Sequence, residues 1–387
     1  PDLPKMIERS RQVSNQLASG IKGLLKKHKI THVQGHGRFL DDTTLQVTHE
    51  EKKHKVTAKH FIIATGARAR ELPHIHADGK RIWLAKHAMT APFLPQKLLV
   101  IGSGAIGIEF ASFFATLGTH VTVVEMQDRI LPQEDKDVSA FAQKQFEKQG
   151  MTFHLKSTVS KVESTLADVH VSIIDQNQKP MDATYDAVIL AVGIQANIED
   201  LGLENTGIKT LPNGIEVNAY NQTSCPHIYA IGDVAGAPWL AHKASHEGVI
   251  VAEHIMGLNP HALNKASIPG CTYSHPQIAS LGLTEEQAKA KGLSVNVGTF
   301  PLIGNGKAQA VGETEGFVKT IFDEKTGELL GAHMIGHEVT EMIQGFTIAK
   351  QLETTEQDLM GTIFPHPTLS EAMHESVLSA YKRAIHY

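Results

Sequence analysis

The sequence predicts an α/β protein with doubly wound parallel sheets, followed by a separate α+β domain at the C-terminus. Apolar strand-like runs alternate with amphipathic helical stretches through most of the chain, which is the pattern of βαβ units. A glycine-rich turn at residues 102–107 joins one such strand to the next helix. After a break at Asn259-Pro260, strand and helix patterns alternate again from Ser267 onward, which indicates a further domain.

The composition is that of a globular protein. At 387 residues the chain is long enough for about two to three domains. Its 41% hydrophobic and 20% charged residues exclude disorder and fibrous repeats. The net charge of −5 provides no basic surface for nucleic acid or for an anionic membrane. The longest apolar stretch, 98–115, contains Glu109 and three glycines, so no membrane segment is expected.

Cysteine and histidine usage bounds the chemistry further. Cys225 and Cys271 are the only cysteines and lie far apart, which argues against a disulfide scaffold and favours a reducing, cytoplasmic compartment. Their default interpretation is as small buried hydrophobic residues. The 23 histidines form no HExxH motif or Cys/His cluster, so no metal site is expected. The chain begins with Pro1 rather than Met, which suggests a fragment.

The first elements follow from periodicity and turn residues. Residues 4–29 repeat apolar side chains at helical spacing and predict one long helix. Residues 31–56 predict short alternating strands separated by Gly and Asp turns. The apolar run 61–64 predicts a strand that ends in the tight turn Thr65-Gly66.

Pro92 and Pro95 mark a boundary, after which strands and helices alternate. The predicted strands are 97–101, 121–125, runs near Phe153 and Val169, 187–192, 228–231, 272–273, 295–299, 316–322 and 329–335. The predicted helices are one that ends at Leu117, then 136–149, 241–256, 284–291, 340–351 and 370–385.

The glycine-rich turn is a GxGxxG motif in the context that makes it specific. It follows a strand, opens a helix, and precedes by about 20 residues an acidic residue, Glu125, at the end of the next strand. Gly102 permits the tight turn, Gly104 lets the backbone approach a pyrophosphate, and Gly107 lets the helix pack on the strand. Glu125 could accept hydrogen bonds from both ribose hydroxyls but would repel a 2′-phosphate, so NAD(H) is preferred to NADP(H). The alternative is a turn kept only for packing.

Two other turns close short apolar strands and are less specific. Thr65-Gly66 and Gly232-Asp233 both stand at the carboxyl end of a strand, where open α/β sheets place groups that contact ligands. An Asx-turn or a helix cap explains Asp233 equally well.

The segment 364–371 places His366 between two prolines. One interpretation is a loop histidine next to a capping box, made by Thr368 and Glu371, for the last helix. The other is a general base: the prolines rigidify the histidine, and Glu371 fixes its tautomer and raises its basicity. A histidine with a pKa near neutrality can take a proton from a thiol.

Together these motifs resemble the flavoprotein disulfide oxidoreductases, and within them the dihydrolipoamide dehydrogenases. The resemblance covers essentially the whole chain. It rests on the turn at residues 64–66, the 102–107 motif with Glu125, the segment 229–243, and the HPTLSE sequence at 366–371. Relatives that use NADP place arginines after the second strand of the Rossmann unit, where this chain has Glu125-Met126.

The resemblance implies roles for particular residues. His366, oriented by Glu371, would be the acid/base and would act on the partner subunit's flavin and dithiol in a homodimer. The bond between His366 and Pro367 would be cis. The implied contacts to FAD are Gly37, Thr65, Gly66, Asp233, Leu240, Ala241 and His242. The implied contacts to NAD are Gly102, Ser103, Gly104, Ala105, Ile106, Gly107, Glu125, Val159 and Gly193.

The sequence departs from the family pattern in two places. The family's first FAD-binding turn and its Cys-x4-Cys redox pair are missing, so an N-terminally truncated chain that is inactive alone is one expectation. Cys225 and Cys271 are not at that spacing and are not expected to replace the pair. The family also has Gly-Arg-x-Pro-Asn where this chain has Gly193-Ile-Gln-Ala-Asn197, so a local polar contact is expected to differ.

The expected domains are residues 1–90 and 223–266 for FAD, 91–222 for a Rossmann NAD-binding domain, and 267–387 for dimerisation. The expected function is oxidation of a protein-bound dihydrolipoyl dithiol through FAD, with reduction of NAD+ to NADH. The expected partners are a second copy of the chain and the lipoyl domain of a 2-oxo acid dehydrogenase complex, with no nucleic acid or membrane. The alternatives are a non-catalytic NAD-binding, dimerising fragment and a related NAD(P)H-disulfide or mercuric reductase.

Overall fold

The fold is described from a computed structural model of residues 2–387. The chain forms two compact units, each made from two segments. The first segment of unit 1 ends at Arg70, and its second segment is Ile194–Lys265. Unit 2 comprises Glu71–Gly193 and Ala266–Tyr387. The finer domain boundaries predicted from the sequence stay a prediction.

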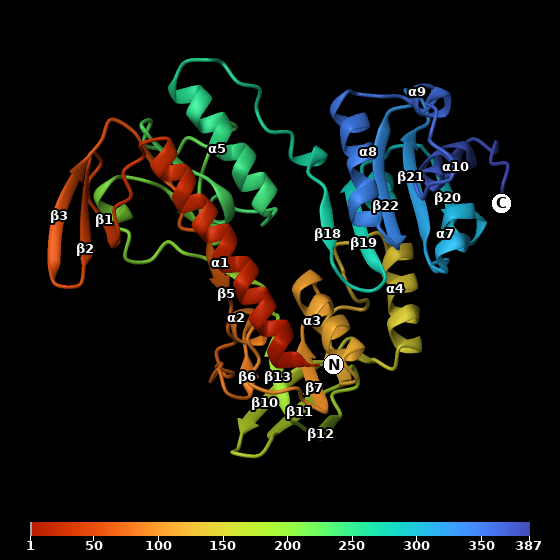
Figure 1. The fold of residues 1–387 in the computed structure, drawn as a ribbon, viewed down its shortest axis with the longest axis horizontal. Coiled ribbons are helices and arrows are strands. Elements are labelled where there is room, and N and C mark those ends of the chain that lie inside the picture. The colour runs from red at the N-terminus through yellow and green to blue at the C-terminus, as the bar shows by residue number, and fades with distance from the viewer. Residues whose placement is uncertain (1) are drawn as a thin grey trace. The chain divides into compact units, whose positions relative to one another are not determined.

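Unit 1 opens with the long helix that the sequence predicts. Helix α1, Leu3–Lys27, begins after Asp2, whose side chain accepts a hydrogen bond from the Lys5 amide. A proline in its first turn has the φ angle that a helix start requires. The positive charges of lysines in its last turn are stabilised by the negative C-terminal end of the helix dipole. Figure 1 shows α1 as a single unbroken helix.

The rest of unit 1 is built from short strands around a small core. Strands β1 (His36–Asp41), β2 (Thr44–His49) and β3 (Lys52–Thr57) form an antiparallel sheet. Strand β4 (Phe61–Ile63) pairs in parallel with β17 (Ile228–Ala230), and β5 (Ala67–Ala69) pairs with β14 (Ile194–Ala196). Strands β15 (Thr210–Leu211) and β16 (Gly214–Ile215) form a further pair. After β17 come a 3-10 turn, Gly232–Ala235, and helix α5, Ala241–Ile255.

Unit 2 contains the βαβ arrangement that the glycine-rich turn predicts. Its five-stranded parallel sheet has the order β6-β13-β7-β8-β9. Strands β7 and β13 lie at its centre and are almost entirely buried, which is why they read as continuous apolar runs. The strands are β6 (Ile82–Trp83), β7 (Lys97–Ile101), β8 (His120–Val124), β9 (Thr152–His154) and β13 (Ala187–Leu190). The helices are α2 (Ala85–Ala88), α3 (Ala105–Thr116) and α4 (Lys136–Lys148). A separate antiparallel sheet contains β10 (Thr158–Ser164), β11 (Val169–Ile174) and β12 (Pro180–Tyr185).

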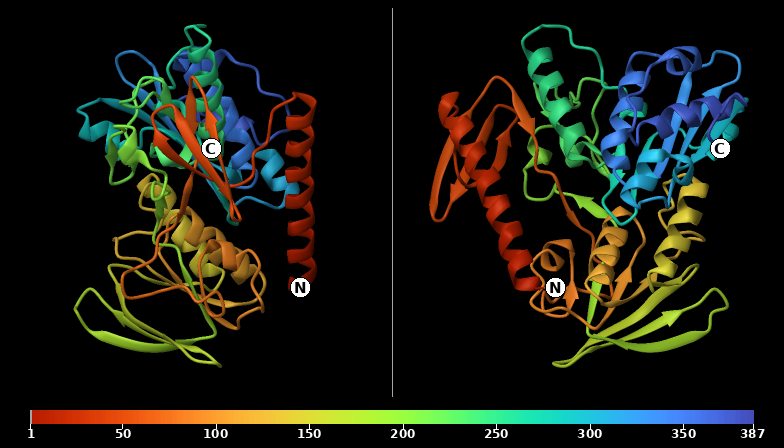
Figure 2. Two further views of the ribbon diagram at one scale, coloured as in Figure 1. Left: turned by 90° about the vertical axis from the view of Figure 1, so that its left-hand side faces the viewer. Right: turned by 45° about the vertical axis from the view of Figure 1, so that its right-hand side comes forward.

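The C-terminal part of unit 2 is a five-stranded antiparallel sheet with helices on its faces (Figure 2). Helices α8 and α10 share one apolar cluster with the sheet, and α6 packs in a second cluster with Ile321 and Leu330. The strands, in sheet order, are β18 (Gly270–Thr272), β19 (Gln277–Gly282), β22 (Leu329–Gly336), β21 (Phe317–Asp323) and β20 (Val295–Pro301). The helices are α6 (Glu285–Ala290), α7 (Gly306–Val311), α8 (Val339–Gln351), α9 (Glu356–Gly361) and α10 (Glu371–Ala380).

The end of the chain differs from the sequence prediction. The last helix was expected over 370–385, but α10 ends at Ala380. The amides of Ile385 and His386 point back to the carboxylate of Glu375, so this segment cannot continue the helical hydrogen-bond pattern. The capping box predicted from Thr368 and Glu371 is only half formed. The Thr368 amide donates to Glu371, but the Thr368 hydroxyl donates to the Pro365 carbonyl.

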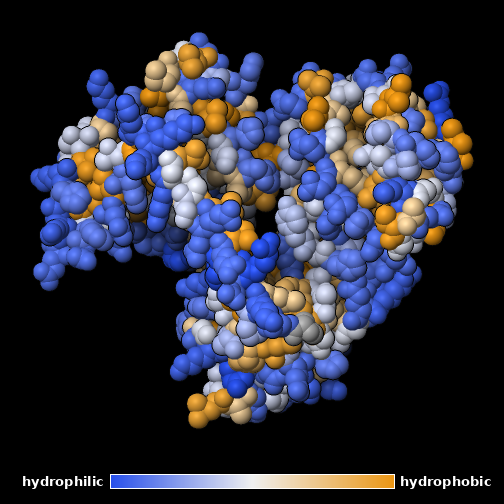
Figure 3. Space-filling view, in the orientation of Figure 1, coloured by the Kyte–Doolittle hydropathy of each residue, from blue (hydrophilic) through white to orange (hydrophobic). Residues whose placement is uncertain are grey.

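The helices of the described residues are not of the membrane-spanning kind. Within residues 2–387, each helix is too short or too polar to cross a bilayer. Figure 3 shows a largely hydrophilic face interrupted by small, separate hydrophobic patches.

Candidate functional site

The glycine-rich turn of unit 2 has space for a side chain at one of its three glycines and no space at the other two. A Cβ on Gly102, whose φ is +100°, would lie 2.3 Å from the Ala191 carbonyl oxygen. A Cβ on Gly107 would lie 2.1 Å from the Gly102 carbonyl oxygen. A Cβ on Gly104 would meet no atom within 4 Å. Gly104 is also the N-cap of α3, where backbone amides are unpaired. No side chain therefore covers the N-terminus of α3 at Gly104, and a pyrophosphate could approach the unpaired backbone amides there.

The Glu125 carboxylate closes this turn. Its Oε2 accepts hydrogen bonds from the Ser103 amide at 2.9 Å and the Ser103 hydroxyl at 2.7 Å, and its Oε1 accepts one from the Gln127 amide at 2.9 Å. Glu125 is buried, so these contacts hold it in one orientation. Each carboxylate oxygen has two lone pairs, which leaves Oε1 able to accept another donor such as a ribose hydroxyl. Ser103 gains a role that the sequence did not assign, because it links the turn to Glu125.

The other residues predicted to contact NAD also lie in unit 2. Val159 is buried in β10, and its carbonyl accepts a hydrogen bond from His74 Nε2 at 3.2 Å. Gly193 follows β13 with a φ of +102° and open space where a side chain would stand. Ala105 and Ile106 form the first turn of α3. The contacts of these residues with a nucleotide stay a prediction.

The Gly232-Asp233 turn in unit 1 is held by a buried ion pair from α5. Lys243 Nζ lies 3.1 Å from Glu247 Oε1 and donates to the carbonyls of Gly232 and Gly236. Glu247 Oε2 accepts a hydrogen bond from the Gly232 amide at 2.7 Å. The pair fixes both ends of the turn that carries Asp233. An acceptor presented on a clamped turn fits the hydroxyls of a flavin's ribityl chain.

The remaining residues predicted to contact FAD also lie in unit 1. Leu240 is the N-cap of α5, and Ala241 and His242 begin that helix with exposed side chains. Gly37 lies in β1, and a Cβ there or on Gly66 would meet no atom within 4 Å. These open positions are compatible with a bound group, and their contacts stay a prediction.

A polar network that the sequence did not predict fixes the Thr65-Gly66 turn. The Thr65 hydroxyl donates to the Asn197 carbonyl, and the Asn197 side-chain amide donates to the Thr65 carbonyl. Arg68 bridges Asn197 and Glu199, and its hydrogen bond lowers the pKa of Glu199 to about 2. The segment 193–197, where the sequence departs from the family pattern, thus supplies its polar contact through Asn197. In the sequence, the polar side chain of Asn197 is the only local sign of this contact, because its partners lie about 130 residues away.

The histidine between two prolines is oriented as the acid/base interpretation predicts. His366 Nδ1 lies 2.9 Å from Glu371 Oε1, and the Thr368 amide donates to Glu371 Oε2 at 2.9 Å. The bond between His366 and Pro367 is cis, which confirms that expectation. The His366 side chain is 78% exposed and Glu371 is 29% exposed. Partial burial raises the pKa of Glu371, but hydrogen bonds from Thr368 and His366 outweigh it, so the pKa lies below its ordinary value. Glu371 is therefore ionised near neutrality, and Nε2 is the free nitrogen of His366.

Comparisons with known proteins give the same picture over the whole chain. Residues 2–248 match the family model described as pyridine nucleotide-disulphide oxidoreductase, and residues 268–377 match the dimerisation domain of that family. The chain is 53% identical to a dihydrolipoyl dehydrogenase of Zymomonas mobilis, aligned over 100% of this chain and 83% of the relative. A dihydrolipoyl dehydrogenase of Rhizobium etli is 49% identical with the same coverage.

Solved structures agree in fold. The chain superposes on LpdA from Mycobacterium tuberculosis with a TM-score of 0.92 at 27% identity, covering 97% of this chain and 83% of that one. It superposes on the HOCl-induced flavoprotein disulfide reductase RclA from Escherichia coli with a TM-score of 0.87 at 26% identity, covering 96% of this chain and 84% of that one.

Proposed function

The chain belongs to the pyridine nucleotide-disulphide oxidoreductase family, and from this premise we propose that it works as a dihydrolipoyl dehydrogenase. In this reaction a dihydrolipoyl dithiol becomes a cyclic disulfide, NAD+ becomes NADH, and one proton is released. The family uses FAD and NAD(H). When bound, FAD supplies the two-electron carrier between the dithiol and NAD+. The observation that carries the choice of substrate is the His366–Glu371 pair, because a nucleotide-binding turn alone serves many reactions.

The NAD site is assigned to unit 2. The amides at the start of α3 would bind the pyrophosphate across Gly104, and Glu125 would bind the adenosine ribose. Two features support the preference for NAD over NADP. Glu125 is fixed by Ser103 and Gln127, and its negative charge would face a 2′-phosphate. Val159 and Gly193 would border the same nucleotide.

The FAD site is assigned to unit 1. Asp233 would accept hydrogen bonds from the ribityl hydroxyls, and the Lys243–Glu247 pair would hold its turn in place. Leu240, Ala241 and His242 would border the ring system at the start of α5. Gly37, Thr65 and Gly66 would lie beside the adenosine half.

His366 is assigned the proton transfer at the dithiol. Its Nε2 would take the proton of the dihydrolipoyl thiol, whose sulfur would attack the redox disulfide of the family, a Cys-x4-Cys pair that this sequence does not contain. A bond between the substrate sulfur and one cysteine forms as the cysteine–cysteine bond breaks, and the other cysteine leaves as a thiolate. The imidazolium that forms would be stabilised by the Glu371 carboxylate 2.9 Å from Nδ1. A side chain that is 78% exposed in one chain needs a second surface to exclude water from it. The dimerisation domain that contains His366 supports a homodimer in which the partner subunit provides that surface. A gel-filtration measurement with light scattering should therefore give twice the mass of one chain.

The thiol exchange and the protein partner complete the proposal. Cys225 and Cys271 do not have the Cys-x4-Cys spacing, in which four residues separate the two cysteines, and we assign them no part in exchange with the substrate. The name of the relatives indicates a dihydrolipoyl group as the substrate. The lipoyl domain of a 2-oxo acid dehydrogenase complex would carry this group.

The test is turnover of the FAD-loaded protein in which a segment with the Cys-x4-Cys pair of the family precedes this chain, because the substrate dithiol needs a disulfide to exchange with. Mixing it with dihydrolipoamide and NAD+ should produce NADH, and the protein should retain visible flavin absorbance after desalting. A chain that binds NAD+ but retains no flavin and produces no NADH would support the non-catalytic fragment instead. Equal or better turnover with NADP+ would favour a related NAD(P)H-linked reductase.

A further inference from the structure

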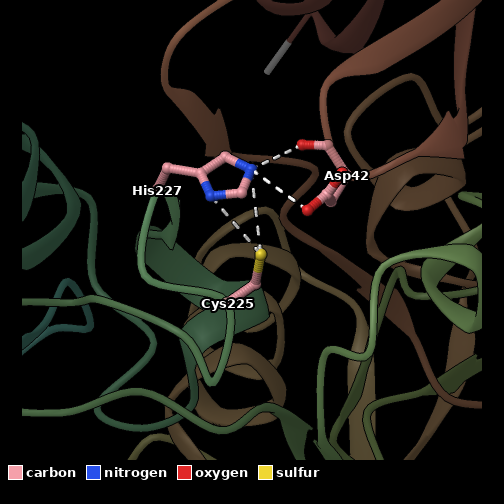
Figure 4. A group of neighbouring side chains, drawn as sticks. All are labelled: Asp42, Cys225 and His227. Atoms are coloured by element: carbon pink, nitrogen blue, oxygen red, sulfur yellow. Dashed lines mark hydrogen bonds and ion pairs between the residues drawn. The ribbon is translucent and has the colours of Figure 1, made fainter.

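Three side chains with metal-binding atoms meet in unit 1, away from every residue assigned above. Asp42 lies in the turn between β1 and β2, and Cys225 and His227 lie just before β17. Figure 4 shows Asp42 beside the His227 ring and the Cys225 sulfur below the ring, so the three side chains form a triangle. Each residue offers one possible ligand atom: a sulfur, a ring nitrogen or a carboxylate oxygen. These three atoms lie within 4.8 Å of one another, and among residues 2–387 no other group of three His, Cys, Asp or Glu residues meets this distance.

The distances between these atoms are too long for strong hydrogen bonds between the side chains and are close to those between atoms that bind one metal ion. Cys225 Sγ lies 3.7 Å from His227 Nδ1 and 3.8 Å from Nε2, and Asp42 Oδ2 lies 3.8 Å from Nε2. An N···O separation of 3.8 Å is too long for a hydrogen bond. Around a tetrahedral Zn²⁺, bond lengths of about 2.0–2.3 Å place such donors about 3.5 Å apart. The 3.7 Å between Cys225 Sγ and His227 Nδ1 is close to this value. The Asp42 carboxylate is 3.8 Å from the other ring nitrogen, Nε2, and has to rotate to reach the same cation.

The imidazole is also oriented in the way that metal-bound histidines are. Nε2 lies 2.7 Å from the backbone carbonyl oxygen of Asp42. A carbonyl can only accept, so Nε2 carries the proton and Nδ1 has the free lone pair. Metal-binding histidines usually donate their second N–H to a carbonyl or carboxylate in this way. The side chain of Asp42 is 50% exposed and can rotate toward the cation while the ring stays in place.

We propose that Asp42, Cys225 and His227 form a binding site for a single zinc ion, with a water molecule as the fourth ligand. The donor set of sulfur, imidazole and carboxylate favours zinc over magnesium or calcium, which prefer oxygen ligands alone. On binding, the metal takes the place of the Cys225 thiol proton, which leaves to solvent, and no electron is transferred. The half-exposed Asp42 and the 28% exposed His227 give the ion a route from solvent.

The site would link two segments of unit 1 that are far apart in sequence. Cys225 belongs to the apolar core of this unit, whereas Asp42 lies at the tip of the β1–β2 hairpin. A bound ion would link the hairpin to the core. Because the ion would bind the folded state and not the unfolded state, the melting temperature would rise with metal concentration. The inference does not depend on the proposed function, and its readouts do not involve catalysis.

The experiment is a Co²⁺ titration of the chain after removal of metals with a chelator. Cobalt bound to a thiolate gives a near-ultraviolet charge-transfer absorbance that histidine and carboxylate sites do not give. The wild-type chain should show this absorbance with saturation at one equivalent, and Zn²⁺ should displace it. The matched variants are Cys225→Ser and Cys271→Ser, which each remove one of the two cysteines. The first should lose the absorbance and the second should keep it.

The other two ligands are tested separately, because Cys225→Ser alters a core position. His227→Gln and Asp42→Asn should each weaken Co²⁺ binding by about tenfold or more, while their metal-free circular dichroism matches the wild type. Zn²⁺ should raise the melting temperature of the wild type but not of His227→Gln. Absence of the charge-transfer signal in the wild type would overturn the site. So would its survival in Cys225→Ser, or an unchanged affinity in both His227→Gln and Asp42→Asn, since a lone thiol would then be the binder.

Discussion

At the scale of single residues, the three glycines of the 102–107 turn have different physical reasons to be there. Gly102 and Gly107 are enforced by folding, because a side chain on either would collide with a backbone carbonyl. Gly104 is not, because open space surrounds its Cβ position. This difference separates the residues that shape the turn from the one that would meet a ligand.

We predict that Gly104→Ala folds normally but binds NAD+ about tenfold or more weakly, which corresponds to about 1.4 kcal/mol. The added methyl group meets no protein atom and instead occupies the space needed for close approach of a phosphate. Isothermal titration with NAD+ measures the effect. The control is Gly102→Ala, which should lower the melting temperature because its φ is +100° and its Cβ would meet the Ala191 carbonyl. Wild-type NAD+ affinity in Gly104→Ala would contradict the assignment.

Residue-level prediction from the sequence succeeded where the signal was local. His366 and Glu371 are five residues apart, and their contact followed from that spacing. Asp42 is 185 residues from His227, so its approach to Cys225 and His227 could not be read from the sequence, and no metal site was expected. The Arg68–Glu199 pair was missed for the same reason, because only the pairing of β5 with β14 brings it together.

At the scale of elements, a buried lysine joins three segments of unit 2. Lys319 lies on β21, and its neighbour Thr320 donates to the Ser376 carbonyl on α10, so Lys319 points to the opposite face of the sheet. There its Nζ lies 2.9 Å from Asp135, 2.6 Å from Asp137 and 2.7 Å from Glu285, at the starts of α4 and α6. Burial lowers the pKa of Lys319, but these carboxylates outweigh it and raise the pKa above its ordinary value.

We predict that Lys319→Met destabilises the chain by about 3–5 kcal/mol, because it leaves the buried Asp135 carboxylate without its partner. The loss is measured from urea unfolding at neutral pH. Lys289→Met is the control, because Lys289 pairs with the same Glu285 but is 62% exposed. That variant should change stability by about 0.5 kcal/mol or less. Similar effects of both variants would contradict a structural role for the buried lysine.

A second element-scale feature is Glu134, which precedes α4 and contacts β19. Its Oε1 accepts a hydrogen bond from the Ser280 hydroxyl, and within the described chain its buried Oε2 has no partner. Burial raises the pKa of Glu134 to about 7, and the neighbouring Asp135 charge adds to this. The folded protein therefore retains a proton that the unfolded chain, with a pKa near 4.5, loses at lower pH.

The sign of the pH effect follows from this raised pKa. The stabilising contribution is fully present below the unfolded value of about 4.5 and is lost as the pH rises through about 7. Glu134→Gln cannot ionise, so it should melt higher than the wild type at about pH 8, by on the order of 2 °C, and the difference should shrink toward about pH 5. Differential scanning calorimetry checks this, with the exposed Glu324→Gln as control. A difference that does not vary with pH would contradict the raised pKa.

The elements predicted from the sequence are those with clear periodicity or an apolar run, and they include the three-residue strands β4 and β17. Helix α1 and strands β7, β8 and β13 have clear periodicity or continuous apolar runs, so the sequence indicated them. Strands of two or three residues have too few positions to establish a period, and they exist only because a partner strand is present. The unpredicted strands of this kind are β5, β6, β14, β15 and β16. The longer strands β10, β12 and β19 were also not predicted.

At the scale of the whole molecule, the predicted class of fold is confirmed by the family match and by the agreement with solved structures. Doubly wound architecture could be inferred because βαβ units leave a regular pattern in sequence. The predicted FAD residues fall in unit 1, and the NAD residues and His366 fall in unit 2. On the proposed assignment each half-reaction depends on its own residues, so a substitution among the residues of one half-reaction should leave the other half-reaction intact.

The most direct measurement uses FAD-loaded protein in which a segment with the Cys-x4-Cys pair of the family precedes this chain, and it compares the two half-reactions in wild type and His366→Gln. The rate at which dihydrolipoamide bleaches the bound flavin reports the dithiol side, and the rate at which NADH bleaches it reports the nucleotide side. His366→Gln should slow the first by about 10²- to 10⁴-fold and leave the second unchanged. His49→Gln, at an exposed position on β2, should change neither. Wild-type dithiol rates in His366→Gln, or equal slowing of both rates, would contradict the assignment of His366 as the acid/base.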